Sequence, residues 1–276
     1  MKDWKHIKKE DLGKESSIEL EILDHEQDIY YEIARMMFDE IKANNDKGKK
    51  TVFICPVGPV GQYRKFARMV NEYKLPLNNV YIFNMDEYLD DNKQPMTLEN
   101  PLSFKNTMEK ELYSRIDEEY NVPKDQRFFP EPEKEAFYWK KMLELGGVDI
   151  CFGGVGINGH IAFNEPPEEH MSLEAFRNVG TRVLEISRET RTINAAMGCG
   201  GCIEAMPKWC ITLGMKEILN SRKIVLGMFR EWQKGIIRQL MYGEITAKVP
   251  ASLLQEHKNV KILASPIVAE EPIKNN

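Results

Sequence analysis

Two stretches of the chain decide how it folds: Val80-Tyr81-Ile82-Phe83-Asn84-Met85-Asp86-Glu87-Tyr88 and Val148-Asp149-Ile150-Cys151-Phe152-Gly153-Gly154-Val155-Gly156. Each begins as a short apolar run, typical of a buried strand, and then changes to titratable residues or glycines. Residues that follow parallel strands meet at one edge of an open sheet, where such folds bind their ligands. The sequence therefore predicts that the ends of these two strands share a site.

Further strands and helices alternate around these two stretches. Strands are predicted at 51–55, 209–213, 223–226 and 259–263, and helices at about 26–44, 64–70, 102–116, 134–145, 215–219 and 232–241. Residues 166–207 are expected to be irregular and to form a lid, and residues 1–24 an N-terminal extension. The alternation predicts an α/β fold: a single Rossmann-like domain over residues 1–276, with a mostly parallel sheet and helices on both faces.

The composition narrows the class of protein. The 276 residues carry a net charge of −5, which argues against nucleic-acid binding because that usually needs a basic face. No apolar run approaches the roughly 20 residues that span a membrane. The charged N-terminus has no apolar segment behind it, so no secretory signal is predicted. The count of five cysteines is odd, and Cys55 and Cys151 lie in predicted strands, so we expect reduced thiols in a cytoplasmic protein.

Three titratable side chains follow the two strands: Asp86, His160 and Glu165. Asp86 lies between an apolar strand and an aromatic residue, so its carboxyl group should be partly desolvated, which raises a pKa and suits a general base. A histidine at a strand end can move protons near neutral pH. Glu165 is close enough in sequence to contact His160 across a turn, and the glycines between 153 and 159 permit close approach to a ligand. Together they predict an acid–base site.

Each of these residues also has a simpler explanation. Asp86 could cap a helix and His160 could be an ordinary loop histidine, because capping residues are common at such junctions. The three residues together at strand ends favour a functional site. The spacing Gly154-x-Gly156-x-x-Gly159 matches a dinucleotide-binding pattern, but that pattern needs small residues in a following helix and an acidic residue about twenty positions on. His160 and Phe163 stand there instead, so NAD binding is rejected.

A Cys-x-x-Cys pair, Cys199 and Cys202, lies in the predicted lid. A zinc site needs about four ligands at matching spacing, and only Cys210 lies near this pair. A flexible loop is therefore favoured, and no metal site is predicted.

With these motifs the chain resembles the glucosamine-6-phosphate deaminase/isomerase family, which is related to the 6-phosphogluconolactonases. The family's Phe-Asn-Met-Asp-Glu-Tyr motif stands unbroken at Phe83–Tyr88, and its Gly-His-Ile-Ala-Phe-Asn-Glu-Pro motif at Gly159–Pro166. The second motif separates the deaminase branch from the lactonases. The resemblance covers roughly residues 25–265 and continues through Pro101–Phe104, Pro207–Trp209, Val225–Gly227 and Pro250–Gln255.

The resemblance implies a Rossmann-like fold and an aldose–ketose isomerisation that releases ammonia. In the family, the aspartate of the first motif moves a proton between C2 and C1 of the opened sugar, a role that falls on Asp86. The histidine and glutamate of the second motif open the sugar ring, roles that fall on His160 and Glu165. The resemblance implies no metal and no organic cofactor, a small-molecule sugar or sugar phosphate as partner, and leaves a homo-oligomer open.

The chain departs from the family at both ends of the site. The family usually has an aspartate two residues before the histidine, where this chain has Asn158. An amide cannot stabilise an imidazolium by charge, so ring opening should be slower. The family's phosphate loop is rich in glycine and threonine, whereas this loop contains Val57, Gly58 and Pro59, and proline has no backbone N–H.

The family's phosphate-binding cations are also displaced. Its arginine aligns near residues 195–197, which hold no basic side chain, so the nearest candidates are Arg188 and Arg191. Its later lysine aligns near Lys234. We therefore expect weak turnover of glucosamine 6-phosphate unless these three cations restore the phosphate site. Three functions stay open: a deaminase of an amino-sugar phosphate, the same chemistry on a sugar without the 6-phosphate, and a catalytically weak sugar-binding homologue.

Overall fold

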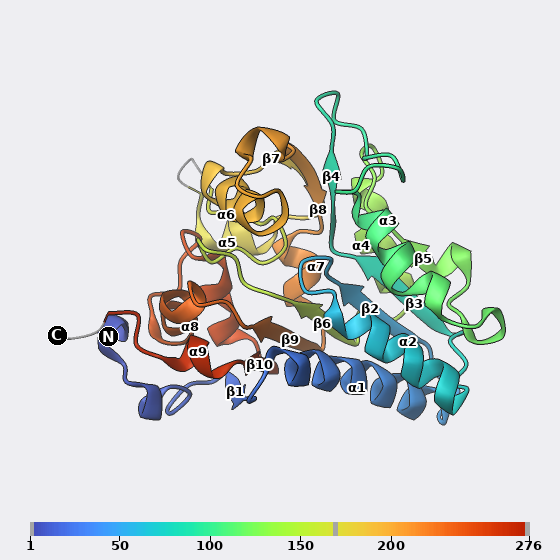
Figure 1. The fold of residues 1–276 in the computed structure, drawn as a ribbon, viewed down its shortest axis with the longest axis horizontal. Helices are drawn as coiled ribbons and strands as arrows, with labels where there is room; N and C mark the ends of the chain where they lie inside the picture. The colour runs from blue at the N-terminus through green and yellow to red at the C-terminus, as the bar shows by residue number, and fades with distance from the viewer. Residues whose placement is uncertain (1–2, 168–170, 274–276) are drawn as a thin grey trace.

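The larger of two sheets forms the centre of the molecule (Figure 1). The computed structural model describes residues 3–167 and 171–273. This sheet has seven parallel strands in the order β1-β10-β9-β6-β2-β3-β5. They are β1 (Glu19–Ile22), β2 (Thr51–Cys55), β3 (Val80–Asn84), β5 (Arg127–Phe128), β6 (Ile150–Gly153), β9 (Lys223–Met228) and β10 (Val260–Ala264). The predicted parallel sheet is confirmed.

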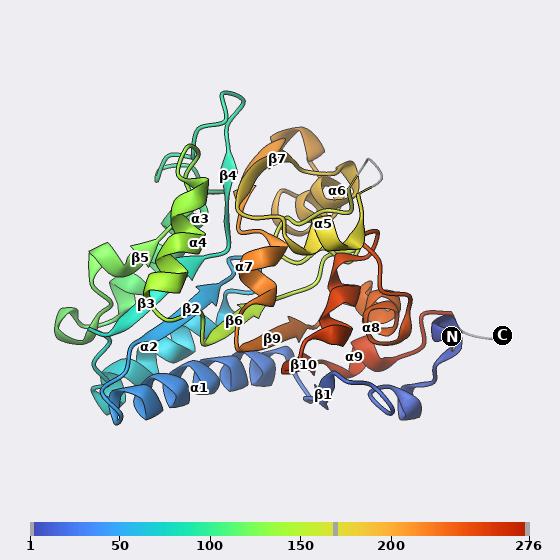
Figure 2. The same cartoon turned by 180° about the vertical axis from the view of Figure 1, so that it is seen from behind.

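Helices cover both faces of this sheet, because its strands are apolar on both sides. On β2, Val52 and Ile54 pack into the cluster on one face, and Phe53 and Cys55 into the cluster on the other. The first face is covered by α4 (Glu135–Glu144), α7 (Met215–Leu219), α8 (Gln233–Tyr242) and α9 (Pro266–Ala269). The second is covered by α1 (Glu26–Asn45), α2 (Gly61–Tyr73) and α3 (Phe104–Glu111), with α1 and α2 nearest the viewer in Figure 1 and α7 in Figure 2. The predicted α/β fold class is confirmed.

Helix α1 shows how sequence sets this packing. Its buried side chains Ile29, Ile33, Met37 and Ile41 recur every four residues and form one apolar stripe. The stripe lies beside α2 because Gly61 lets the two helices approach, since a Cβ at Gly61 would stand 2.3 Å from a ring atom of α1. Helices α1 and α2 are therefore fixed against the sheet at the end where β2 leads into its loop.

A second, smaller sheet rises above the carboxyl ends of the large sheet (Figures 1 and 2). It has three antiparallel strands in the order β4-β8-β7, namely β4 (Asp86–Leu89), β8 (Trp209–Thr212) and β7 (Arg182–Glu185). Helices α5 (Leu173–Arg177) and α6 (Arg188–Gly198) lie beside it. Met85 joins the two sheets: its N–H donates to Cys55 in the large sheet, and its carbonyl accepts from Leu213, the residue after β8.

The structure corrects two expectations from the sequence. Residues 166–207 are not irregular, because they contain α5, β7 and α6. Strand β7 was missed because its partner β8 lies more than twenty residues away, beyond local pattern analysis. The helix expected at 102–116 is α3 followed by a short 3-10 turn, because Leu112 leaves the helical conformation. The 3-10 helices are η1 (Trp4–His6), η2 (Lys9–Asp11), η3 (Tyr113–Arg115), η4 (Glu118–Tyr120), η5 (Lys124–Gln126), η6 (Ile203–Ala205) and η7 (Pro250–Glu256).

The strand order places a crevice between β2 and β6. The chain runs from β2 outward to β3 and β5, returns to β6 on the other side of β2, and continues to β9 and β10. The loops after β2 and β6 therefore diverge toward opposite faces, which is where ligands bind in open α/β sheets. In the part of the chain that the structure describes, no helix is long and apolar enough to cross a membrane.

Candidate active site

A cavity of about 430 Å³ lies at this crevice. Its walls come from the loops after β2, β6 and β9, the start of β4, and the sides of α3 and α6. The lining residues used below are Val57, Gly58, Pro59, Asp86, Tyr88, His160, Asn194, Phe229, Arg230 and Gln233. Both sheets therefore contribute, and the sequence prediction that Asp86 and His160 share a site agrees with their common cavity.

Asp86 is a nearly bare carboxylate at the wall of this cavity. It is the first residue of β4 and is 6% exposed. Among the residues that the structure describes, no donor hydrogen-bonds its carboxyl oxygens. Burial, and then the negative charge of Glu87, raise the pKa of Asp86 to about 8. A carboxylate that nothing stabilises is a stronger base than an ordinary one.

The neighbouring carboxylate, Glu87, has a structural role instead. It points away from the cavity lining and caps the first turn of α3, accepting from the backbone N–H groups of Phe104 and Lys105, each at 2.8 Å. The Ser103 hydroxyl and the Tyr88 N–H also donate to it. Burial raises the pKa of Glu87 in spite of these donors. Two adjacent carboxylates on one strand thus face opposite sides, as the two-residue period of a strand requires.

His160 is held by a chain of hydrogen bonds that ends at Glu165. The His160 Nδ1 lies 2.8 Å from Asn158 Oδ1, and the Asn158 amide donates to Glu165 Oε2 at 2.6 Å. His160 Nδ1 and Glu165 Oε2 are themselves 3.5 Å apart. Burial would raise the pKa of Glu165, but hydrogen bonding and attraction to His160, with the Asn158 hydrogen bond, lower it to about 2. Glu165 is therefore an ionised carboxylate, which accepts hydrogen bonds and donates none.

This chain fixes the tautomer of the histidine. Because ionised Glu165 can only accept, Asn158 must turn its NH2 group toward Glu165 and its oxygen toward His160. The oxygen can only accept, so His160 carries its proton on Nδ1. In the neutral ring Nε2 is then left with a lone pair, as a base requires. Asn158 thus orients His160 by hydrogen bonding, although it supplies no charge.

The backbone around His160 has the features that this placement needs. The imidazole lies against Gly156, where a Cβ would stand 2.1 Å from His160 Cε1. Gly159 has φ +86, and a Cβ there would stand 2.7 Å from Val249. Ala162, which lines the cavity, has φ +58, a conformation that is uncommon for a residue with a side chain. Such strain gathers at functional sites.

At the far end of the cavity lies the loop that the sequence predicted as a binding loop. Val57, Gly58 and Pro59 all line the cavity there. The loop leads into α2, whose N-cap residue Val60 makes no side-chain hydrogen bond to the helix. The first backbone N–H groups of a helix attract anions when no capping side chain accepts from them.

Arg230 provides a cation at this end of the cavity. Its guanidinium lies 4.8 Å from the Phe229 ring centroid, and it forms no ion pair with any carboxylate in the described residues. Gln233 fixes its backbone by accepting from the N–H groups of Phe229 and Arg230, both at 2.8 Å. Sequence analysis missed Arg230, although its place directly after strand β9 is the kind of position that lines such a site.

The three cations named from the sequence do not line this cavity. The guanidinium of Arg191 donates to the carbonyls of Ile203 and Met206, each at 3.2 Å. The Lys234 ammonium pairs with Glu231 at 2.9 Å. Arg188 is exposed at the first turn of α6. Arg230 is thus better placed than any of them to meet an anionic group.

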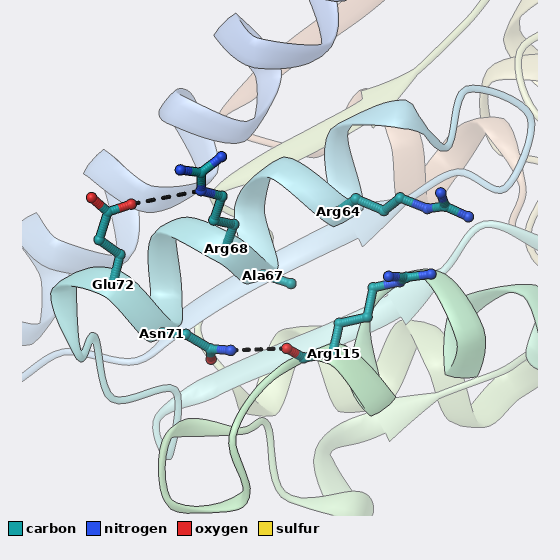
Figure 3. Close-up of a pocket in the computed structure, with 6 residues that line it drawn as sticks. All are labelled: Arg64, Ala67, Arg68, Asn71, Glu72 and Arg115. Atoms are coloured by element: carbon teal, nitrogen blue, oxygen red, sulfur yellow. Dashed lines mark hydrogen bonds and ion pairs between the residues drawn. The ribbon is translucent and has the colours of Figure 1, made fainter.

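A second hollow of about 510 Å³ lies on the outer side of α2 (Figure 3). Three arginines line it, but each lies near an acidic partner or carbonyl: Arg64 is hydrogen-bonded to Glu111, Arg68 lies 3.8 Å from Glu72, and Arg115 donates to the Lys110 carbonyl at 2.7 Å. The carboxylate in its lining, Glu72, is exposed and lies beside Arg68, so it is not activated as a base. We therefore place the active site at the crevice.

The cysteines and the other possible metal ligands give no second site in the described part of the chain. All five cysteines are free thiols, with Cys55, Cys151 and Cys210 buried, Cys199 half-buried and Cys202 exposed. Within residues 3–167 and 171–273, no three His, Cys, Asp or Glu side chains gather in a group that could hold a metal ion.

The chain is similar to known glucosamine-6-phosphate deaminases. A glucosamine-6-phosphate deaminase from Mycoplasmopsis pulmonis is 30% identical over 257 residues, spanning 90% of this chain and 94% of that protein. One from Clostridium perfringens (strain 13 / Type A) is 28% identical over 242 residues, spanning 85% and 93%. No family model matches the chain.

Solved structures agree with this likeness. A monomeric glucosamine-6-phosphate deaminase superposes with a TM-score of 0.78 at 26% identity, covering 91% of this chain and 99% of that one. A 6-phosphogluconolactonase from Thermotoga maritima superposes with a TM-score of 0.63 at 15% identity, covering 90% and 99%. The second likeness extends to the fold alone.

Proposed function

Because the chain belongs to the glucosamine-6-phosphate deaminase family, we propose that it isomerises an amino-sugar phosphate to a keto-sugar phosphate and releases ammonia. The observation that carries the proposal is the bare carboxylate of Asp86, which shares one cavity with a histidine locked as a base. In this proposal the chain is a single domain, because the site takes residues from both sheets.

The first step is opening of the sugar ring. The lone pair on His160 Nε2 accepts the proton of the C1 hydroxyl while the bond between C1 and the ring oxygen breaks. The ring oxygen then takes up a proton, which His160 can return. Ionised Glu165, acting through Asn158, stabilises the positive charge that His160 carries between these events.

The second step is proton transfer between adjacent carbons. Asp86 removes the proton from C2 as the C1 carbonyl oxygen gains one, which gives an enolamine. Asp86 then returns its proton to C1, and C2 becomes an iminium carbon. Water adds to C2 and ammonia leaves, so the products are the ketose phosphate and ammonia. A single base serves both carbons because the carboxyl proton stays buried between the two transfers.

The phosphate is expected at the end of the cavity formed by Gly58, Pro59 and Arg230. A guanidinium and the open N-terminus of α2 supply complementary charge from two sides. The loop sequence alone predicted weak turnover of the phosphorylated sugar, because Pro59 removes a donor. Arg230 reverses that expectation, because its guanidinium forms no ion pair with a carboxylate in the described residues and can therefore bind the phosphate.

Parallel assays of ammonia release test this function. Glucosamine 6-phosphate should be turned over with a kcat/KM at least about tenfold above that of glucosamine, because a charge-assisted hydrogen bond contributes about 1.5–3 kcal/mol. Equal or greater turnover of glucosamine would favour a substrate without the 6-phosphate. Ammonia release from neither sugar, with sugar binding retained, would favour a catalytically weak homologue.

The pH dependence of kcat/KM gives an independent check. Asp86 must be ionised to act as a base, and its pKa in the empty site is about 8. Activity should therefore be low at pH 6, rise about tenfold per pH unit, and level off above about pH 8. In Glu87→Gln the neighbouring charge is gone, so the rise should begin at lower pH. A flat profile between pH 6.5 and pH 9 would contradict the role of Asp86.

A further inference from the structure

We propose that Thr190, on helix α6, is a positioning residue that holds the His160 imidazole in its reactive orientation. The inference rests on the proposed function for its kinetic consequence, but not for its structural content. Thr190 lies outside the cavity lining and is 1% exposed, so it does not touch the substrate. Its hydroxyl contacts His160 at Nδ1, whereas the proposed function assigns the sugar to Nε2.

The contacts of Thr190 place it within the His160 network. Its Oγ1 lies 3.2 Å from His160 Nδ1 and 3.1 Å from Ser187 Oγ. Ser187, the N-cap residue of α6, also donates to Glu165 Oε2 at 3.2 Å. The hydroxyl of Thr190 is among the hydrogen bonds that lower the pKa of Glu165. The first turn of α6 therefore contacts both ends of the network.

The donors and acceptors around His160 Nδ1 define the role of Thr190. Three oxygens surround His160 Nδ1: Asn158 Oδ1 at 2.8 Å, Thr190 Oγ1 at 3.2 Å and Glu165 Oε2 at 3.5 Å. Of these groups only the threonine hydroxyl could donate to an unprotonated Nδ1. Because Asn158 Oδ1 and ionised Glu165 keep a proton on Nδ1, Thr190 Oγ1 meets that N–H with a lone pair. All three oxygens then accept toward the same N–H and leave Nε2 free, and Thr190 adds the contact from α6 that fixes the position of the ring.

Helix α6 also ties this network to the opposite wall of the site. Asn194 lies one turn after Thr190 on the same side of the helix and donates to the Tyr88 hydroxyl at 3.0 Å. Tyr88 is on β4, two residues after Asp86. Thr190 and Asn194 thus fix one helix against both the histidine and the strand that carries the base, so loss of one contact need not displace the helix.

The isosteric variant Thr190→Val removes the hydroxyl and keeps the volume. Its kcat on glucosamine 6-phosphate should fall about ten- to hundred-fold, the usual effect of losing a partner that orients a histidine, with KM changed less than about twofold. Thr190→Ser should restore most of the loss. Thr192→Val is the matched control and should be neutral, because Thr192 is exposed on the same helix and donates only to the Arg188 carbonyl.

Nitrogen NMR of the imidazole tests the structural content without any substrate. In the parent protein the His160 signals, assigned by their loss in His160→Gln, should show a protonated Nδ1, and in Thr190→Val the same tautomer with a shifted Nδ1 signal, because one of its acceptors is lost. An unshifted Nδ1 signal, or a loss of kcat equal to that of Thr192→Val, would overturn the inference. If the valine variant fails to fold, Thr190→Ser and Thr190→Ala should differ in the same way. A shifted Nδ1 signal in a protein that releases no ammonia would sink the proposed function and leave the inference standing.

Discussion

Asp86→Asn is expected to lower ammonia release by about a thousand-fold or more and to abolish exchange of solvent hydrogen into C2 of the substrate. The amide keeps the shape of the side chain but cannot take a proton from carbon, and general-base contributions reach about 10²- to 10⁴-fold. Steady-state assays and mass spectrometry of recovered substrate in heavy water measure the two effects separately.

The same substitution should stabilise the fold at alkaline pH. The pKa of Asp86 is raised to about 8 in the folded protein, above that of an unfolded chain, about 4. The folded state therefore binds more protons than the unfolded state across this range, and stability falls as pH rises from about 4 to about 8. Asp86→Asn removes this loss, so its Tm should exceed that of the parent at pH 9 and match it near pH 4.

Glu87→Gln is the matched control for this variant. It changes the adjacent carboxylate to an amide, but it weakens the cap of α3 and leaves the base in place. We expect it to lower Tm and to retain exchange at C2. If Asp86→Asn retained exchange at C2, the proton would have to move through another group, and the assignment of Asp86 would be wrong.

Arg230→Gln is expected to raise KM for glucosamine 6-phosphate about ten- to hundred-fold, with a smaller change in kcat. The substitution removes the only guanidinium among the described cavity-lining residues, and a hydrogen bond to a charged group contributes about 1.5–3 kcal/mol. Turnover of glucosamine should be unchanged, so the ratio of the two kcat/KM values should collapse. The affinity for inorganic phosphate, measured by direct binding, should fall in the same way, and this measurement does not require turnover.

Lys234→Gln controls for the general loss of a positive charge from this region. Lys234 lies four residues after Arg230 but pairs with Glu231 outside the cavity lining. It should leave KM for the phosphorylated sugar within about twofold. A larger effect from Lys234 than from Arg230 would show that the phosphate is held in the way first inferred from the sequence.

The catalytic end of the site was predictable because it depends on local sequence. Asp86 and His160 each lie in the segment after an apolar strand, and the carboxyl ends of strands in a parallel sheet meet at one edge. The phosphate end was less predictable, because Arg230 stands in a short motif with no pattern of its own. Which of several cations enters the cavity depends on what each one pairs with, and Arg191 and Lys234 are bound elsewhere.

The small sheet and the contacts of α6 lay beyond sequence analysis for a different reason. Strand β7 is recognisable only beside β8, and Asp86 was expected at the end of one strand, whereas it also begins the next, β4. Thr190 reaches His160 from thirty positions along the chain. A hydroxyl in a polar stretch is an ordinary residue until its neighbour in space is known.

The residue Met85 couples the two sheets. Its N–H is bonded to the end of β2 in the large sheet, and its carbonyl accepts from the residue after β8 in the small one, so neither sheet can open at this point without releasing a hydrogen bond beside Asp86. Local unfolding usually spreads through contiguous units and spares the rest. Here the boundary between two such units coincides with the base, and opening of either sheet at Met85 would displace it. The catalytic geometry should therefore persist as long as these strand ends stay paired and disappear when they separate.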